Sequence, residues 1–204
     1  MIEWSLLAFG ASDSIEAVVI AAPPGFEEEA ERAAAAVIPE LTVEAVAGGA
    51  SRADSVRLAM TVVPSELVTV HDAARPLVTA ELIDRVVGRL ASGEADGVIA
   101  AAPVADTLKR GGEGDSTVAE TVGRSGLWGA QTPQAFRAEA LRAAQGAAEA
   151  AGVLAEATDE AWLLERVGGT VLLEAAGEPN PKVTDSADLA LAAALLGAGS
   201  LRDG

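Results

Sequence analysis

Polar side chains suited to binding phosphate and hydrated metal ions follow several apolar segments of this sequence. The sharpest cluster is HDAARP, residues 71–76. A carboxylate such as Asp72 can hold Mg²⁺ through bound water or pair with a cation, and Arg75 can grip a phosphate with two hydrogen bonds. A local ion pair that stabilises a loop explains the same pattern. His71 is the only histidine, and the sequence offers no companion residues that would complete a metal site or a catalytic triad with it. We expect His71 to point into the core.

A glycine pair begins the second cluster, GGASRADSV, residues 48–56. Its two glycines let backbone N–H groups approach a ligand closely, and Ser55 adds a hydroxyl near the start of a helix. The stretch lacks the GxxxxGK[ST] pattern of a Walker loop. A tight turn followed by a helix cap explains it equally well.

Hydroxyls and cations continue through the second half of the chain. Thr107 and Arg124 supply a hydroxyl and a fixed cation, which are the components of a phosphate site. Thr132 and Thr158 add hydroxyls, and each can also be interpreted as a helix N-cap. Lys182 is one of only two lysines and follows a strand-like segment. A solvated surface lysine is the alternative interpretation of that position.

The elements that position these residues alternate between strand and helix. The pattern predicts strands over 16–22, 41–46, 67–71, 97–103 and 170–174. It predicts helices over 26–37, 55–62, 79–90, 137–151, 159–166 and 186–196, with Thr79 as an N-cap. This alternation indicates an α/β fold with right-handed βαβ units and a mainly parallel sheet. Ligands of such sheets bind beyond the carboxyl ends of the strands, where the clusters above lie.

Residues 105–124 interrupt the alternation. They contain few apolar residues and a turn cluster at 111–114, so we predict a hairpin arm that projects from the core, with a flexible loop as the alternative. The chain shows no internal repeat and no linker. We therefore expect one domain over residues 1–204, with the arm at about 105–124.

The composition excludes several classes of protein. Its 31 acidic and 14 basic residues give a formal net charge of −17, which disfavours nucleic acid as a partner. A phosphorylated substrate would need the positive groups concentrated in one cleft. There is no cysteine, no apolar run of about 20 residues and no secretory signal. We expect a cytoplasmic protein without a membrane partner.

Taken in order, the motifs resemble a known family. GGASRADSV, VHDAARP, APVADTLKR, TVGRSGLWGAQTPQAF, ATDEAWLLE and PKVTDSADLALA together resemble the 2-C-methyl-D-erythritol 4-phosphate cytidylyltransferases, from about Met1 to Leu196. The resemblance implies a Rossmann-like nucleotidyltransferase fold, CTP as co-substrate and Mg²⁺ as cofactor. It also implies a homodimer whose arms help to complete the partner's site.

The resemblance assigns roles to individual residues. It implies contacts to the cytidine nucleotide from Gly49, Ser55, Asp72 and Ala73, with Asp72 facing Mg²⁺ through bound water. It implies sugar-phosphate and phosphate contacts from Arg75, Thr107, Arg124, Thr132, Thr158 and Lys182. Arg124 and Lys182 resemble the catalytic pair that positions the attacking methylerythritol phosphate.

The implied reaction transfers CMP from CTP to 2-C-methyl-D-erythritol 4-phosphate and releases pyrophosphate, in non-mevalonate isoprenoid precursor synthesis. A phosphomonoester is mostly dianionic near pH 7, because its second pKa is about 6, so it needs no general base. Two alternatives stay open. One is a cytidylyltransferase for another polyol phosphate, such as ribitol 5-phosphate, and the other is a non-catalytic dimerising module.

The chain departs from the family pattern at its start. Family members begin with a strand and a glycine-rich loop that carries an arginine and a lysine, whereas residues 1–5 resemble the helix after that loop. We expect the strand, the loop and both cations to be missing, through a misplaced start or because the sequence is a fragment. Losing one preorganised donor can lower a rate on the order of 10²–10³-fold, so we expect impaired activity.

Overall fold

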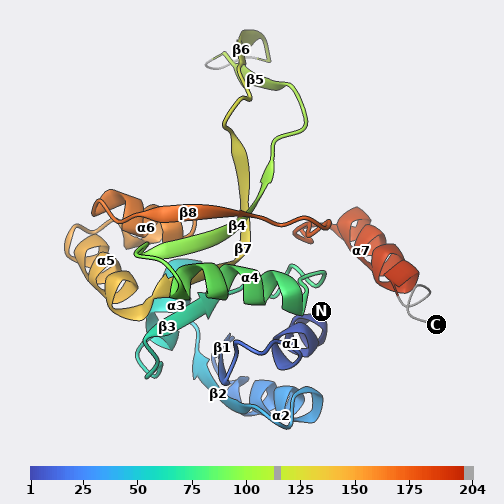
Figure 1. Ribbon diagram of the computed structural model, residues 1–204, viewed down its shortest axis with the longest axis vertical. Helices are drawn as coiled ribbons and strands as arrows, with labels where there is room; N and C mark the ends of the chain where they lie inside the picture. The colour runs from blue at the N-terminus through green and yellow to red at the C-terminus, as the bar shows by residue number, and fades with distance from the viewer. Residues whose placement is uncertain (113–115, 200–204) are drawn as a thin grey trace.

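The computed structural model describes residues 1–112 and 116–199 (Figure 1). The α/β fold predicted from the sequence is confirmed. The strands are β1 (Ala17–Ala22), β2 (Thr42–Ala47), β3 (Leu67–Val70), β4 (Gly97–Pro103), β5 (Leu108–Gly111), β6 (Val118–Val122), β7 (Trp128–Arg137) and β8 (Val171–Ala175). The helices are α1 (Ile2–Gly10), α2 (Glu27–Val37), α3 (Arg52–Ala59), α4 (Ala80–Ala91), α5 (Ala138–Ala150), α6 (Glu160–Arg166) and α7 (Ser186–Gly199), with a 3₁₀ helix at Leu154–Glu156.

The central strands form two separate sheets. β1 and β2 pair in parallel, and a second sheet has the order β3-β7-β4-β8. The pair β4 and β8 is parallel, whereas β7 runs antiparallel to both β3 and β4. The parallel pairs expected from the βαβ pattern are therefore present, and β7 makes the larger sheet mixed.

The sequence pattern does not predict β7, although this strand lies in the middle of the larger sheet. Its segment contains Gly129 and Pro133, and a proline within a run normally argues against a central strand. The register with β4 shifts between Ile99 and Ala101, so Pro133 lies opposite an irregularity in the ladder. Such an irregularity accommodates a residue that cannot donate a backbone hydrogen bond.

Caps set the starts of two helices. Thr79 accepts a hydrogen bond from the Leu82 N–H at 3.2 Å, which confirms it as the N-cap of α4. Helix α3 begins at Arg52 rather than at Ser55, because the Ser51 side chain accepts from the Asp54 N–H and caps the helix there. Arg52 is thereby placed in the first turn of α3.

Strands β5 and β6 form an antiparallel hairpin that projects from the body of the molecule (Figure 1). The predicted arm is confirmed over the residues that the structure describes. Glu113 and Gly114 of the predicted turn cluster lie outside those residues. Within the described ranges, no helix has the length and apolar character needed to cross a membrane.

Candidate functional site

Asp72 lies two residues after the end of β3, and two cations bind its carboxylate. Arg52 Nε donates to Oδ1 at 2.9 Å, and Lys182 Nζ donates to Oδ2 at 3.0 Å. Burial raises the pKa of Asp72, but the charges and hydrogen bonds of Arg52 and Lys182 lower this pKa by more, so that it falls below its ordinary value. Asp72 is therefore ionised at neutral pH, with a cation on each oxygen.

Arg52 also binds Glu160, whose side chain has no exposed surface. Nη1 of Arg52 lies 2.9 Å from Oε1 and 2.8 Å from Oε2 of Glu160. Burial raises the pKa of Glu160 and outweighs the opposing effect of Arg52. Burial lowers the pKa of Arg52, but attraction to Glu160 and Asp72 raises it by more. One guanidinium thus joins the first turns of α3 and α6 to the end of β3.

His71 bridges the loop after β3 and strand β7. Its Nε2 lies 3.1 Å from the Arg75 carbonyl oxygen, and its Nδ1 lies 3.0 Å from Thr132 Oγ1. A carbonyl oxygen can only accept, so Nε2 carries the proton and Nδ1 accepts from the Thr132 hydroxyl. Burial lowers the pKa of His71 to about 4, so the ring is neutral at pH 7. The ring also packs against Phe9, which agrees with the expected inward orientation.

Neither Thr132 nor Thr158 caps a helix. Thr132 is buried within β7, where its hydroxyl also accepts the Asp72 N–H at 3.1 Å. Thr158 is exposed and precedes Asp159, which caps α6 by accepting from the Trp162 N–H at 2.9 Å. The N-cap interpretation of both threonines is therefore wrong.

Arg75 connects the loop after β3 to the loop that carries Lys182. Its Nη1 donates to the Asn180 carbonyl oxygen at 2.7 Å, and the Val183 N–H donates to the Ala74 carbonyl oxygen at 2.8 Å. Burial lowers the pKa of Arg75, although its guanidinium remains charged at neutral pH. These bonds hold Lys182 beside Asp72. The structure therefore brings together Asp72, Arg75 and Lys182 of the predicted site.

The glycine pair forms a tight turn before α3. The Gly49 N–H donates to Ser55 Oγ at 3.0 Å, and Ser55 Oγ donates to the Ser51 carbonyl oxygen at 2.9 Å. A Cβ atom on Gly49 would lie 2.4 Å from Cβ of Asp54, a distance that requires the backbone to shift. Close backbone packing thus demands glycine at position 49.

Arg124 and Thr107 lie away from this group of residues, on the arm and at its base. Arg124 Nη1 donates to the Ala105 carbonyl oxygen, across the base of the arm. Thr107 and Arg124 are both exposed, as is Ala73. In the part of the chain that the structure describes, no hydrogen bond joins Thr107 or Arg124 to Asp72 or Lys182.

Sequence reasoning did not single out Arg52, Glu160 or Asn180. Arg52 lies in the first turn of a helix, where a cation opposes the helix dipole, and this unfavourable placement could have marked it. Glu160 directly precedes the apolar segment AWLL, residues 161–164, whose expected burial could have drawn attention to its charge. Asn180 is buried, and its Nδ2 donates to the Thr132 carbonyl oxygen at 2.8 Å. No sequence signal distinguishes Asn180 from a loop residue.

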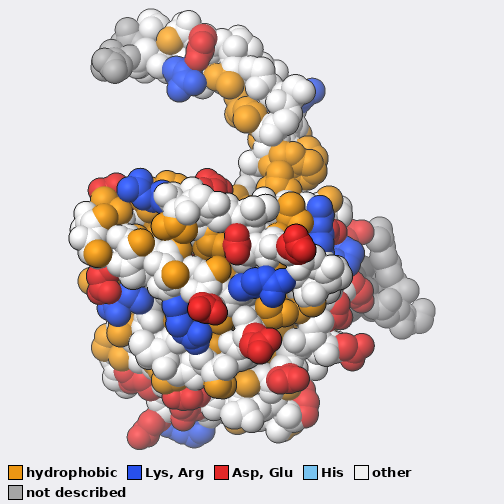
Figure 2. Space-filling view, turned by 60° about the vertical axis from the view of Figure 1, so that its left-hand side comes forward, with side chains coloured by type: hydrophobic (Ala, Val, Ile, Leu, Met, Phe, Trp, Pro, Cys, Tyr) orange, Lys and Arg blue, Asp and Glu red, His pale blue; other side chains and the backbone are white. Residues whose placement is uncertain are grey.

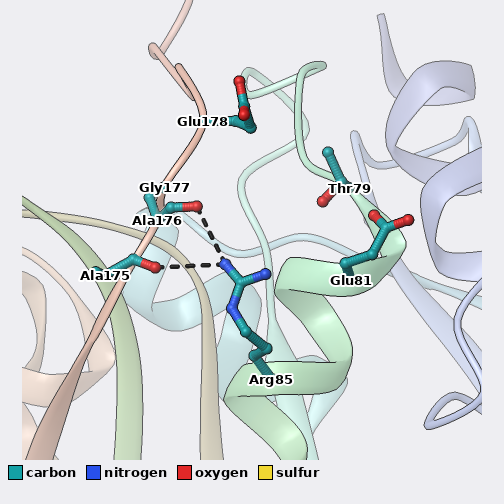
Figure 3. Close-up of a pocket in the computed structure, with 7 residues that line it drawn as sticks. All are labelled: Thr79, Glu81, Arg85, Ala175, Ala176, Gly177 and Glu178. Carbon is teal, nitrogen blue, oxygen red and sulfur yellow. Dashed lines mark hydrogen bonds between the residues drawn. The ribbon is translucent and has the colours of Figure 1, made fainter.

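A separate hollow of about 480 Å³ lies between the start of α4 and the residues after β8 (Figure 3). Arg85 projects into it and donates from Nη2 to the carbonyl oxygens of Ala175 and Ala176, at 3.4 Å and 3.2 Å. Glu81 and Glu178 also line it. None of the predicted site residues lines this hollow, so we place the candidate site at Asp72.

The chain matches the family model described as IspD: 2-C-methyl-D-erythritol 4-phosphate cytidylyltransferase over residues 1–198. A Halorhodospira halophila protein named 2-C-methyl-D-erythritol 4-phosphate cytidylyltransferase is 47% identical over 159 residues, which are 76% of this chain and 64% of that protein. A Rhodospirillum rubrum protein named bifunctional enzyme IspD/IspF is 50% identical over 150 residues, which are 72% of this chain and 37% of that protein. The chain thus spans less than two thirds of the length of these two relatives.

Solved structures give the same likeness. The crystal structure of 2-C-methyl-D-erythritol 4-phosphate cytidylyltransferase from Thermus thermophilus matches with a TM-score of 0.79 and 34% identity, covering 95% of this chain and 87% of that chain. The crystal structure of 4-diphosphocytidyl-2C-methyl-D-erythritol synthase from Anaerococcus prevotii matches with a TM-score of 0.84 and 25% identity. The match covers 96% of this chain and 88% of that chain. These likenesses confirm the nucleotidyltransferase-like fold that the motifs implied.

Proposed function

This chain belongs to the 2-C-methyl-D-erythritol 4-phosphate cytidylyltransferase family, and we propose that it transfers CMP from CTP to 2-C-methyl-D-erythritol 4-phosphate. A phosphate oxygen of the acceptor forms a bond to the α-phosphorus of CTP, and the bond from that phosphorus to pyrophosphate breaks. The products are the CDP-methylerythritol intermediate and pyrophosphate. The acceptor is already mostly dianionic, so the obstacle is repulsion between two anions, and fixed cations reduce that repulsion.

One observation carries this proposal. Arg52, Arg75 and Lys182 gather around the loop after β3, although the whole chain has a formal net charge of −17. Lys182 is 43% exposed and its ammonium has one carboxylate partner, so a substrate phosphate can take the place of Asp72.

The family motifs supply the remaining roles within the proposal. Gly49, Ser55, Asp72 and Ala73 bind the cytidine nucleotide, and the close approach at Gly49 suits a backbone contact. The sugar-phosphate and phosphate contacts come from Arg75, Thr107, Arg124, Thr132, Thr158 and Lys182, with Arg124 and Lys182 positioning the acceptor. The hydroxyl of Thr132 also bonds to His71 and to the Asp72 N–H, so the same residue fixes the loop that carries Asp72.

Mg²⁺ is part of the proposal, with Asp72 as its protein contact. The described residues contain no group of three or more acidic, histidine or cysteine side chains able to hold a metal ion. Mg²⁺ commonly keeps several waters and takes one or two carboxylates plus substrate phosphates, so a single ionised carboxylate fits. The exposed Lys182 can vacate Oδ2 for a Mg²⁺-bound water. When bound, the ion would neutralise charge on the triphosphate.

A homodimer built through the arm is a further part of the proposal. Arg124 and Thr107 are exposed, and Arg124 bonds to the Ala105 carbonyl oxygen at the base of the arm, which suits residues that act in a partner's site. Hydrophobic side chains gather where the arm leaves the body (Figure 2), and Leu127 and Trp128 are each 38% exposed. Sedimentation velocity checks this point: a monomer at all concentrations would contradict it.

We assign residues 1–204 to a single cytoplasmic cytidylyltransferase domain, with impaired activity when these residues act alone. The reason is that the triphosphate would meet only the cations described above, Arg52, Arg75 and Lys182. Brisk turnover by this polypeptide would contradict the expected impairment.

The test of the proposal is transfer of labelled CMP from CTP to defined acceptors in the presence of Mg²⁺. Product with 2-C-methyl-D-erythritol 4-phosphate, and at least tenfold less with ribitol 5-phosphate, is the expected result. The reverse preference would favour the other polyol phosphate. Calorimetric titration with CTP is the second measurement. Dimerisation without any response to CTP and Mg²⁺ would favour a non-catalytic module.

A further inference from the structure

Asn180 is buried, with 3% of its surface exposed, although it lies in the connection from β8 to α7. Residues 176–185 form this connection, which contains neither helix nor strand (Figure 1). Connections normally run over the surface and leave their polar side chains to solvent. The burial of Asn180 therefore marks the point at which this connection is anchored to the body of the molecule.

The side chain of Asn180 is anchored on β7. Its Nδ2 donates to the Thr132 carbonyl oxygen at 2.8 Å and to Gln131 Oε1 at 3.3 Å. Strand β7 pairs with β3 on one side and with β4 on the other, so both acceptors belong to a strand in the middle of the larger sheet. The Asn180 amide is therefore held by one of the most constrained strands of the fold.

The main chain of Asn180 makes a second link, to the loop after β3. Its carbonyl oxygen accepts a hydrogen bond from Arg75 Nη1 at 2.7 Å. Thr132, which holds the Asn180 side chain, also accepts the Asp72 N–H through its own hydroxyl. Asn180 is thus tied to the two segments that position Asp72 and Arg75. Only the side-chain link depends on the residue type, because every residue has a backbone carbonyl oxygen.

Two prolines stiffen the chain on both sides of Asn180. Pro179 precedes it, and Pro181 separates it from Lys182. A proline fixes its own φ angle and restricts the residue before it, so Pro181 limits the backbone of Asn180 as well as its own. Beyond Lys182, the Val183 N–H donates to a carbonyl oxygen of the loop after β3 at 2.8 Å. The Lys182 backbone is therefore held between two fastened residues.

The Lys182 side chain depends on this backbone for its direction. Its Nζ lies 3.0 Å from Asp72 Oδ2, and 43% of the side chain is exposed. A lysine ammonium is a point charge on a flexible four-carbon stem, so its own rotamers do not fix where the charge lies. A displaced backbone would move the ammonium away from Asp72 and from a phosphate bound there. Misplacement by about 1 Å can weaken a catalytic arrangement on the order of 10²-fold.

We propose that Asn180 is a positioning residue: its side-chain amide fixes the Lys182 ammonium in the place where it meets the phosphate of the acceptor. This role rests on the proposed function, in which Lys182 contacts that phosphate, and it adds a residue that touches no substrate itself. Asn180 acts through Lys182, by holding residues 179–182 on β7. Loss of the amide should release these residues and leave the Lys182 ammonium badly placed.

Backbone order at Lys182 tests the proposal without any substrate. Labelling with ¹⁵N-lysine gives two amide signals, because Lys109 and Lys182 are the only lysines. In the wild type we expect an NMR order parameter of about 0.85 for the Lys182 amide, and in Asn180→Ala a value below about 0.6. Lys109 lies on β5 of the arm and is the internal reference, which should not change. An unchanged value at Lys182 in Asn180→Ala would overturn the proposal.

A double-mutant cycle tests whether Asn180 acts through Lys182. Calorimetric titration with 2-C-methyl-D-erythritol 4-phosphate measures the affinity of each variant. Asn180→Ala should weaken binding about 5- to 10-fold, as expected when one hydrogen bond to phosphate is poorly formed. On a Lys182→Ala background the same change should alter the affinity by less than about twofold, since no ammonium is left to position. No loss on the wild-type background, or an equal loss on both backgrounds, would overturn the proposal.

Gln145→Ala is the matched control for the loss of a buried amide. Gln145 is 2% exposed and lies on α5, away from the residues that hold Lys182. Its replacement should leave the Lys182 order parameter and the acceptor affinity as they are in the wild type. Equal effects of Gln145→Ala and Asn180→Ala would mean that the effect is general, and the positioning role would then be wrong.

Pro181→Gly is the second variant, should Asn180→Ala fail to fold. It retains the Asn180 side chain but frees the backbone between Asn180 and Lys182, because glycine is conformationally permissive. We expect the same fall in the Lys182 order parameter, and a loss of acceptor affinity that again disappears on the Lys182→Ala background. Wild-type order and affinity in Pro181→Gly would overturn the proposal.

Failure of the positioning role and failure of the proposed function give different results. A wild-type chain that binds no acceptor contradicts the proposed function. The order parameters of Lys182 then decide on their own whether Asn180 fixes it. A wild-type chain that binds the acceptor, with an additive cycle, leaves the function intact and removes only the role of Asn180.

Discussion

Nη1 of Arg52 lies 2.8 Å from Oε2 of Glu160, a carboxylate that is completely buried. The same guanidinium holds Asp72 at 2.9 Å, so a buried charge on α6 fixes the direction of the carboxylate at the candidate site. Arg52 is a positioning residue in this arrangement. Its removal would leave Asp72 with Lys182 as its one cation and Glu160 without its ion-pair partner.

Arg52→Met should lower the free energy of unfolding at pH 7 by about 3–5 kcal/mol, because it leaves a buried carboxylate without its partner. The double variant Arg52→Met with Glu160→Leu should recover most of that loss, since an apolar pair replaces the ion pair. Urea unfolding measures both. Arg32→Met, at an exposed position of α2, is the control and should change little. A loss in the double variant as large as in the single one would contradict this account.

His71 should make stability rise with pH between about pH 4 and pH 6.5. Its pKa is lowered to about 4 in the folded protein from 6.5 in the unfolded chain, so the unfolded state binds more protons in that window. Across the window the contribution is about 3 kcal/mol. Glu160 acts in the opposite sense, because its raised pKa makes the folded state bind more protons. The difference between wild type and His71→Gln in urea unfolding at several pH values isolates the histidine, and parallel pH profiles would refute the assignment.

Lys182→Ala should weaken binding of 2-C-methyl-D-erythritol 4-phosphate by about 10- to 100-fold, because a charge-assisted hydrogen bond to phosphate is lost. Asp72 keeps its bond to Arg52, so the fold should remain stable. The only other lysine provides the control: Lys109 bonds to Thr121 on the arm, and Lys109→Ala should bind as wild type does. Calorimetric titration at fixed ionic strength makes the comparison. Equal affinity in both variants would remove Lys182 from the site.

Gly49→Ala should destabilise the protein by about 1–3 kcal/mol, because its Cβ would lie 2.4 Å from Cβ of Asp54. Gly146→Ala is the matched control within α5, where nothing lies within 4 Å of the added Cβ. That change should stabilise by up to about 1 kcal/mol, since alanine is the better helix former. Thermal unfolding of the two variants should therefore shift in opposite directions, and a shift of the same sign would contradict the packing argument.

The sequence predicts elements whose side chains are apolar on a regular period. β4 is an uninterrupted apolar run from Val98 to Ala101, and its burial on both faces follows from that run. α4 begins at a capping threonine, which the sequence also indicates. These features depend on local chemistry, so they can be recognised from neighbouring residues alone.

Long-range partners could not be recognised in this way. β7 becomes a strand because β3 and β4 bond to it on both sides, which overrides the weak strand propensity around Pro133. Arg52 and Glu160 are far apart in the chain, and their pairing depends on how α3 and α6 approach the end of β3. The motifs located Asp72, Arg75 and Lys182, whereas the residue that orients Asp72 emerged only from the fold.

The bonds from Arg75 to Asn180 and from Val183 to Ala74 also bear on the order of synthesis. During translation, the loop after β3 leaves the ribosome more than a hundred residues before its C-terminal partners do. Arg75 and Asp72 therefore lack their partners Asn180 and Lys182 until almost the entire chain has been synthesised. A nascent chain that stops before Asn180 can already contain every described strand of both sheets while the loop after β3 still lacks its C-terminal partners.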